Sequence, residues 1–167
     1  TLEHEAKIVI PANLAKPFVE IARNLGVPPI LSYSFYCLNN WRRPNPKEPI
    51  AVHNLELLQH FLGGLDERHF ILIHTEIERK LGPAVFGIAN AQELVLDNDV
   101  TSLSEQLELM AQAENDAVTT MHRMVEACHP DIYYLRVRPY IFGFNLPGAP
   151  GKVVFEGVDE RVPVLRG

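Results

Sequence analysis

The feature that most constrains the fold is a long amphipathic pattern between residues 102 and 129. Ser102 and Glu105 have the spacing of a capping box, in which the two side chains satisfy backbone N–H groups at a helix start. Apolar residues then recur every three or four positions, which is the period of one helix face. They are Leu103, Leu107, Met110, Ala113, Ala117, Met121, Met124 and Val125. Because Pro130 cannot continue a helix, the pattern predicts one long helix that ends shortly before it.

Two shorter helices are expected nearer the N-terminus. Residues 17–25 place apolar side chains at helical spacing, and Gly26 ends the pattern. Asn54 is a suitable cap for a helix over residues 54–62, which two glycines stop. Residues 30–41 are rich in aromatic side chains and fit either a buried helix or a strand, because so short a run has no decisive period.

Residues 66–96 predict a pair of helices. Asp66 is a suitable cap for the first, and Gly82 followed by Pro83 is expected to end it. Pro83 then fits the first turn of a second helix that reaches about Leu96.

The sequence therefore predicts an all-α fold with few strand-like connections. Residues 146–151 predict a loop, and residues 153–156 and 162–165 predict short extended pieces. We expect residues 1–62 to be the end of a small lobe and residues 63–167 the start of a large helical lobe, with the chain incomplete at both ends.

Composition argues against several classes of function. Fifteen basic and twenty-one acidic residues give a net charge of −6 without any basic tract, so no nucleic-acid partner is expected. Two cysteines are too few for a disulfide scaffold and favour a cytoplasmic location. No apolar run has the length of a membrane span, so no membrane partner is expected. The histidines lack metal-ligand spacing, and no metal site is expected within this chain.

Two arginines lie inside an aromatic and apolar run, P-D-I-Y-Y-L-R-V-R-P-Y-I-F-G-F-N, at residues 130–145. A guanidinium buried without a partner is costly, so such an arginine reaches water, pairs with an acidic group of its own protein, or holds a ligand anion. Arg138 is the stronger candidate for the last role, because Pro139 places it at a helix end or kink. Pairing within the protein and binding of a ligand carboxylate both remain open for Arg138.

His74 follows Phe70 by one helical turn, so an aromatic ring and an imidazole can face one cavity. In one alternative the imidazole is satisfied by a backbone carbonyl or by Glu78, one turn further on. In the other it makes a polar contact with a substrate. Further aromatic side chains could complete such a cavity or belong to the core. They are Tyr33, Tyr36, Tyr133 and Tyr134.

Four stretches, in this order and spacing, resemble the indoleamine 2,3-dioxygenase family. They are L-G-V-P-P-I-L-S-Y (25–33), L-N-N-W-R-R-P-N-P-K-E-P (38–49), H-F-I-L-I-H-T-E-I-E (69–78) and P-D-I-Y-Y-L-R-V-R-P-Y-I-F-G-F (130–144). The resemblance implies a helical protein with a haem b between a small and a large lobe. It implies that both atoms of O₂ are inserted across the indole C2–C3 bond of L-tryptophan or a related indoleamine, which gives N-formylkynurenine. It further implies tryptophan catabolism through the kynurenine pathway and an electron donor that keeps the haem iron ferrous.

The resemblance also implies residue roles by position. Arg138 resembles the arginine that binds the substrate carboxylate, and Phe70 resembles the phenylalanine that lies against the indole ring. The other expected pocket residues are Tyr33 and Tyr133 at the substrate, and Tyr36 and Cys37 at the haem.

Two departures from the family pattern matter. His74 falls where the best-known animal members carry serine, so it is expected to be a hydrogen-bond partner of the indole N–H or of bound O₂ and not an obligatory base. The axial histidine of the family lies beyond residue 167, so none of the seven histidines here is expected to bind the iron. The alternatives are a related haem protein with different indole chemistry and a non-catalytic indole- or haem-binding module.

Overall fold

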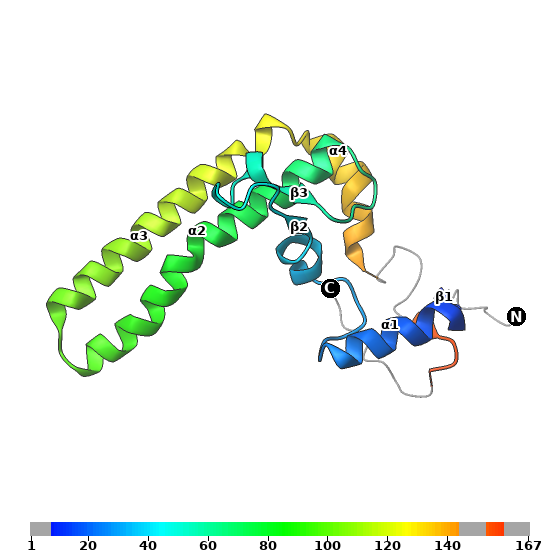
Figure 1. Ribbon diagram of the computed structural model, residues 1–167, viewed down its shortest axis with the longest axis horizontal. Coiled ribbons are helices and arrows are strands. Elements are labelled where there is room, and N and C mark those ends of the chain that lie inside the picture. The colour runs from blue at the N-terminus through cyan, green and yellow to red at the C-terminus, as the bar shows by residue number, and fades with distance from the viewer. Residues whose placement is uncertain (1–7, 144–152, 159–167) are drawn as a thin grey trace, which may run out of the picture. The chain divides into compact units, whose positions relative to one another are not determined.

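The computed structural model describes residues 8–143 and 153–158, which form mostly helices (Figure 1). The α-helices are α1 (Ala12–Asn24), α2 (Leu65–Leu96), α3 (Val100–His122) and the single turn α4 (Pro130–Ile132). The prediction of an all-α fold is confirmed. No helix within the described residues is long and apolar enough to cross a membrane.

The chain divides into two compact units. The first unit combines the residues up to Ser32 with those from Val137 onward, and the second is Tyr33–Arg136. The expected boundary between lobes at residues 62 and 63 falls inside the second unit, and it remains a prediction about lobes of a longer protein.

In the first unit, α1 packs on a two-stranded parallel sheet. Strand β1 (Ile8–Ile10) pairs with β4 (Val153–Phe155), which confirms the extended segment predicted there. The predicted helix over residues 17–25 exists but begins earlier, at Ala12. The backbone N–H of Ala12 donates to Glu156 Oε2 at 3.0 Å, a distant partner that local periodicity does not reveal. The extended piece predicted at residues 162–165 and the loop at 146–151 lie outside the described residues.

The second unit is built on α2 and α3, which lie side by side as a long antiparallel pair (Figure 1). The two helices approach closely at Gly87, which is buried. A Cβ added at Gly87 would lie only 2.6 Å from Met110 Cγ. A hydrogen atom at this position therefore sets how closely the helices pack.

We expect Gly87→Val to lower the free energy of unfolding by about 1–3 kcal/mol, because the added carbons overlap with Met110. Urea unfolding followed by circular dichroism measures the change. Ala89→Val, at an exposed position of the same helix, measures the helix propensity cost of valine relative to alanine without new contacts, and at Gly87 propensity alone would favour valine over glycine. Equal losses in the two variants would show that packing at Gly87 is not the cause.

The helix α2 continues through Gly82 and Pro83, so the break predicted there is wrong. A proline inside a helix removes one N–H donor, and its ring usually clashes with the Cβ of the preceding residue. Gly82 has no Cβ and thus tolerates the following proline in a helical backbone. The packing of α2 along α3 then stabilises one continuous helix where local propensity predicts two.

Both long helices begin at other residues than predicted. Gly64 precedes the first residue of α2, and Asp66 instead accepts a hydrogen bond from the backbone N–H of His129 at 2.7 Å. Asp99 caps α3, since its Oδ1 accepts from the Ser102 N–H at 3.1 Å and its Oδ2 from the Ser102 hydroxyl at 2.7 Å. The capping box predicted at Ser102 is therefore wrong. An aspartate is an equally good cap, and it lies three residues earlier.

Residues 54–62 do not form the predicted helix. They contain the end of a 3₁₀ turn, η2 (Val52–Asn54), and strand β3 (Glu56–Leu57), which pairs antiparallel with β2 (Trp41–Arg42). The aromatic segment before β2 forms a π-helical turn, η1 (Ser34–Leu38). That segment, predicted as helix or strand, thus contains a helical turn followed by the start of a strand.

Two side chains explain why no helix forms after residue 54. Asn54 Nδ2 donates to the carbonyls of Asn45 at 2.9 Å and Pro49 at 3.0 Å, so it closes the preceding loop and does not cap a helix. The fully buried Glu67 carboxylate accepts the backbone N–H groups of residues 61, 62 and 63 at 2.8, 2.9 and 2.8 Å. These donors are satisfied by a side chain of α2 and need no helix of their own.

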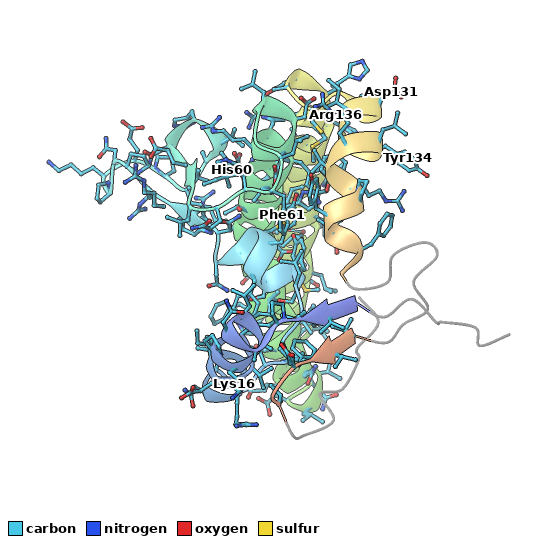
Figure 2. All side chains as sticks on the ribbon, turned by 90° about the vertical axis from the view of Figure 1, so that its right-hand side faces the viewer. Lys16, His60, Phe61, Asp131, Tyr134 and Arg136 are labelled. Carbon is cyan, nitrogen blue, oxygen red and sulfur yellow. The ribbon has the colours of Figure 1, made fainter. Side chains whose placement is uncertain are left out.

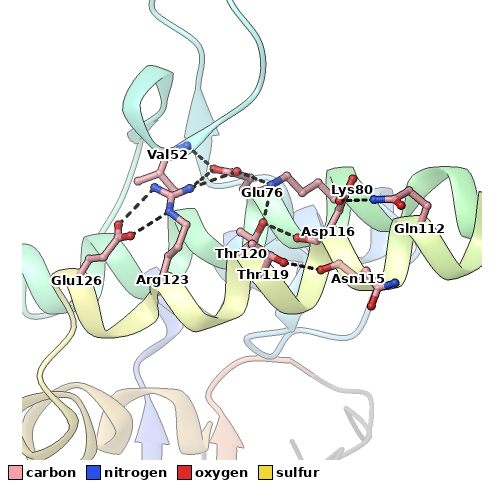
Figure 3. A network of polar contacts seen from close by, with 10 residues as sticks. All are labelled: Val52, Glu76, Lys80, Gln112, Asn115, Asp116, Thr119, Thr120, Arg123 and Glu126. Carbon is pink, nitrogen blue, oxygen red and sulfur yellow. Dashed lines mark hydrogen bonds and ion pairs between the residues drawn. The ribbon is translucent and has the colours of Figure 1, made fainter.

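The core of the second unit lies between α2 and the η2 turn. Its buried members are Val52, Leu55, Leu72 and Ile73. At its edge the buried Glu76 accepts from the Val52 N–H at 2.8 Å. Lys80 and Arg123 pair with the same carboxylate at 3.1 and 3.4 Å, and Figure 3 draws these contacts as dashed lines. One carboxylate therefore ties α2, the η2 turn and the segment after α3 together.

Candidate functional site

The aromatic residues expected at the site do cluster in the second unit. The ring of Phe70 stacks on Tyr133 with centroids 3.9 Å apart and lies 4.2 Å from the ring of His74. Tyr33 meets the edge of His74 at 6.0 Å. Thus Phe70 and His74 share one face of α2, as their spacing predicts, and the rings follow the order Tyr133, Phe70, His74, Tyr33. We call these four residues the ring cluster.

The hydrogen bond of His74 fixes the proton on its ring. Nδ1 lies 2.8 Å from the backbone carbonyl oxygen of Phe70. Since a carbonyl only accepts, Nδ1 carries the hydrogen, and Nε2 of the neutral ring is left as an acceptor. The alternative of a histidine satisfied by a backbone carbonyl is confirmed for Nδ1, and Nε2 keeps a lone pair for a further contact.

Tyr33, at one end of the ring cluster, is held by a carboxylate. Its hydroxyl donates to Glu78 Oε1 at 3.0 Å, so Glu78 contacts Tyr33 and not, as one alternative had it, His74. Burial and the hydrogen bond to Glu78 raise the pKa of the Tyr33 hydroxyl. The phenol is therefore protonated at neutral pH and acts as a donor.

Tyr36 and Cys37 are both buried on the π-helical turn η1. Thr75 Oγ1 donates to the Cys37 carbonyl at 3.2 Å, and Asn40 Nδ2 donates to the Tyr36 carbonyl at 3.1 Å. Burial, with a smaller contribution from Glu78, raises the pKa of the Cys37 thiol to about 12. The thiol is thus an unreactive packing group at neutral pH.

Sequence reasoning missed Thr75 and Asn40, which position this turn. The structure buries both polar side chains. Buried polar residues usually have a defined hydrogen-bond role, but burial is seen only in the folded chain, and no local pattern marks these two positions.

The hydroxyls of Tyr36 and Tyr133 are buried, and among the described residues they meet only one another, in a geometry too poor for a regular hydrogen bond. Burial is the main cause that raises the pKa of each, and the contact between the hydroxyls raises the pKa of Tyr36 further and partly lowers that of Tyr133. Leaving a buried hydroxyl unpaired costs about 1–3 kcal/mol. Tyr133 begins a second π-helical turn, η4 (Tyr133–Val137).

Arg138 belongs to the first unit, at the junction of two kinds of helix. It is the first residue of the 3₁₀ turn η5 (Arg138–Phe142), directly after η4. This confirms the helix junction predicted from Pro139. The guanidinium carbon lies 5.3 Å from the centroid of the Phe142 ring, a cation–π contact that orients the side chain.

Two other side chains of the aromatic run are exposed. Arg136 and Tyr134 both lie in η4, and Tyr134, which is 60% exposed, points away from α2 in Figure 2.

Among the described residues there is no group of three or more His, Cys, Asp or Glu side chains that could hold a metal ion. His69, for example, places Nε2 2.9 Å from the Arg123 carbonyl.

Comparison with known proteins agrees with the resemblance. The sequence matches the family profile described as "Indoleamine 2,3-dioxygenase" over residues 1–167. It is 34% identical to indoleamine 2,3-dioxygenase 2 of Mus musculus over 93% of this chain and 39% of that protein. It is 30% identical to indoleamine 2,3-dioxygenase 1 of Mus musculus over 99% of this chain and 41% of that protein.

A relative with a different name is also similar. The myoglobin of Haliotis madaka is 26% identical over 95% of this chain and 40% of that protein. The chain thus spans about two fifths of the length of the curated relatives that it matches. With a family match along its whole length, the chain belongs to the indoleamine 2,3-dioxygenase family.

Proposed function

We propose that the protein is a haem-dependent dioxygenase that cleaves the indole C2–C3 bond of L-tryptophan or a related indoleamine with O₂ and yields N-formylkynurenine. The observation that carries this proposal is the ring cluster. Phe70, His74 and Tyr133, which the resemblance implies for the substrate pocket, lie in contact with one another. Membership of the family supports the reaction class.

The residues of the second unit fit one wall of a haem pocket. Tyr36 and Cys37 form a buried surface, and the Tyr36 hydroxyl, which meets only the Tyr133 hydroxyl among the described residues, has capacity left to face a bound group. When bound, haem b would supply the redox and O₂ chemistry, while the chain supplies position, polarity and exclusion of water. We propose that none of the seven histidines of this chain is the axial ligand of the haem iron.

Two side chains are proposed to bind the substrate at opposite ends. The Arg138 guanidinium would bind the carboxylate through paired hydrogen bonds, for which its planar shape is suited. Its contact with Phe142 supports this role, because it limits the rotamers of a long side chain before a ligand arrives. Phe70 would pack against the indole ring.

His74 is proposed to accept a hydrogen bond from the indole N–H. His74 could form a hydrogen bond with the indole N–H or with bound O₂, and the first role fits the position of its proton. The Nδ1–H donates to the Phe70 carbonyl, so Nε2 of a neutral ring can only accept. A hydrogen bond from Nε2 to bound O₂ would need a protonated imidazolium. His74 thus orients the substrate and is not an obligatory base.

We expect His74→Ala to weaken binding of L-tryptophan about threefold to tenfold, the usual size for one neutral hydrogen bond. Equilibrium titration of the haem-loaded protein measures the dissociation constant. N1-methyl-L-tryptophan has no indole N–H and is the control, so its affinity should not fall in the same variant. An equal loss for both compounds would contradict the proposed hydrogen bond, and complete loss of turnover would indicate a true base.

Further parts of the proposal follow from the family. We propose that residues 1–62 close the small lobe and residues 63–167 open the large one. The protein would work in the cytoplasm, within the kynurenine pathway of tryptophan catabolism. An electron donor would keep the haem iron ferrous.

Because one similar protein is named myoglobin, we also consider a second candidate function, a haem protein with different chemistry. Incubation of the full-length, haem-loaded protein with L-tryptophan and O₂ separates the two. The dioxygenase produces N-formylkynurenine in many turnovers, detected by mass spectrometry. Reversible O₂ binding with all tryptophan recovered would support the second candidate and contradict the first.

A further inference from the structure

The Glu78 carboxylate is a charged group of the second unit to which the proposed chemistry assigns no role. Glu78 follows His74 by one turn of α2, and His74 follows Phe70 by one turn, so the three side chains share one helix face. Oε1 of Glu78 accepts the hydroxyl of Tyr33, which is 45 residues away in the chain and directly precedes η1, at 3.0 Å. Glu78 therefore ties one end of the ring cluster to α2.

The bond to Glu78 sets the direction in which the phenol hydrogen of Tyr33 points. Burial, followed by the hydrogen bond to Glu78, raises the pKa of this hydroxyl, so the hydrogen is present at neutral pH. Tyr33 is 45% exposed, so packing alone does not hold its side chain in one orientation. Without the carboxylate, the hydroxyl would be free to turn toward another acceptor.

The ring of His74 offers such an acceptor beside Tyr33. The two rings meet edge to face, with an angle of 75° between their planes and centroids 6.0 Å apart. The Nδ1–H of His74 donates to the Phe70 carbonyl, and within residues 8–143 and 153–158 its Nε2 has no hydrogen-bond partner. A phenol and an indole N–H are both donors, so the Tyr33 hydroxyl and the indole of a substrate could compete for the same lone pair.

We propose that Glu78 is a positioning residue that holds the Tyr33 hydroxyl away from His74 Nε2 and thereby keeps this acceptor free for the indole N–H. The inference rests on the proposed function and deepens it, because it names a residue that controls the acceptor without touching the substrate. The turn η1 has a second tie to α2, since Thr75 Oγ1 donates to the Cys37 carbonyl at 3.2 Å. Removal of the Glu78 carboxylate should therefore redirect one hydroxyl and leave the turn in place.

The test measures the dissociation constant of L-tryptophan for the full-length, haem-loaded protein and its variants. Glu78→Ala should weaken binding about threefold to tenfold, the size of one neutral hydrogen bond, because the Tyr33 hydroxyl then occupies the acceptor. Glu78→Gln keeps an acceptor oxygen at the same place and should bind as the wild type. The double variant Tyr33→Phe, Glu78→Ala lacks the competing hydroxyl, so its affinity should return to that of Tyr33→Phe alone.

Two controls separate this role from a merely structural one. N1-methyl-L-tryptophan has no indole N–H, so Glu78→Ala should leave its affinity unchanged. Glu93→Ala removes an exposed carboxylate from the same helix and should bind both compounds as the wild type.

Three results would overturn the inference while binding and cleavage of L-tryptophan by the wild type still support the proposed function. They are unchanged binding of L-tryptophan in Glu78→Ala, an equal loss for the methylated compound, and a loss that Tyr33→Phe does not restore in the double variant. If the wild type binds no L-tryptophan, the inference and the proposed function are both overturned.

Discussion

Glu76→Gln should lower the free energy of unfolding by about 3 kcal/mol at neutral pH, which is the size expected when one partner of a buried ion pair is removed. The carboxylate is only 4% exposed and interacts with Lys80, Arg123 and the Val52 N–H. A glutamine keeps the shape and one acceptor oxygen, but it removes the charge that pairs with Lys80 and leaves Arg123 paired with Glu126 alone among the described residues. Urea unfolding at pH 7 measures the difference.

The effect of Glu76→Gln should depend on pH in a defined direction. Burial by itself would raise the pKa of Glu76, but the Val52 N–H, Lys80 and Arg123 outweigh it and hold the pKa below its ordinary value. A carboxyl whose folded pKa is lowered contributes stability above its unfolded pKa and loses it as the pH falls through the folded pKa. The difference between the wild type and the variant should therefore shrink as the pH falls below the ordinary glutamate pKa of about 4.3, and it should disappear only below the lowered folded pKa.

Glu126→Gln is the matched control for this prediction. Glu126 pairs with the same Arg123 at 3.2 Å, but its side chain is 52% exposed. Solvent screens an exposed pair, so we expect a loss of at most about 1 kcal/mol. If the two variants lose equal stability, the burial of Glu76 is not what gives it its effect.

Arg138→Ala should reduce kcat/KM for L-tryptophan about tenfold to 150-fold. This factor corresponds to a loss of roughly 1.5–3 kcal/mol of transition-state stabilisation. The reason is the loss of charged hydrogen bonds to the substrate carboxylate. Arg138→Lys should recover only part of the activity, because an ammonium group cannot form the paired contact of a guanidinium. Steady-state kinetics of the full-length protein measure each value.

The substrate tryptamine, which lacks the carboxylate, tests the cause of this loss. Its kcat/KM should be low in the wild type and almost unchanged in Arg138→Ala. Arg136→Ala, two residues earlier and exposed, should behave as the wild type with both substrates. An equal fall for tryptophan and tryptamine in Arg138→Ala would mean that Arg138 has a structural role only.

The sequence predicts well those features that depend on near neighbours in the chain. The shared face of Phe70 and His74 follows from a separation of one helical turn, and the structure places their rings 4.2 Å apart. The junction at Arg138 follows from the proline after it. The contact of Tyr133 with Phe70 has no such local signal: the aromatic residues alone leave a shared cavity and separate core positions both open, and only the family resemblance places Tyr133 at the substrate.

The features that local patterns miss depend on partners distant in sequence. Pro83 predicts a break, yet packing between α2 and α3 keeps the helix continuous. Residues 61–63 lie in a predicted helix, yet the Glu67 carboxylate binds their N–H groups. The approach of the buried Tyr36 and Tyr133 hydroxyls to one another could not be predicted, because the two residues are far apart in sequence.

The proposal that this chain supplies the substrate side of an indole-cleaving dioxygenase can be tested by isotope incorporation. The full-length, haem-loaded protein is incubated with L-tryptophan under ¹⁸O₂, and the mass of the product is measured by mass spectrometry. We expect N-formylkynurenine that carries two ¹⁸O atoms, one at each end of the cleaved C2–C3 bond. A product with one labelled atom or none, or tryptophan recovered unchanged, would contradict it.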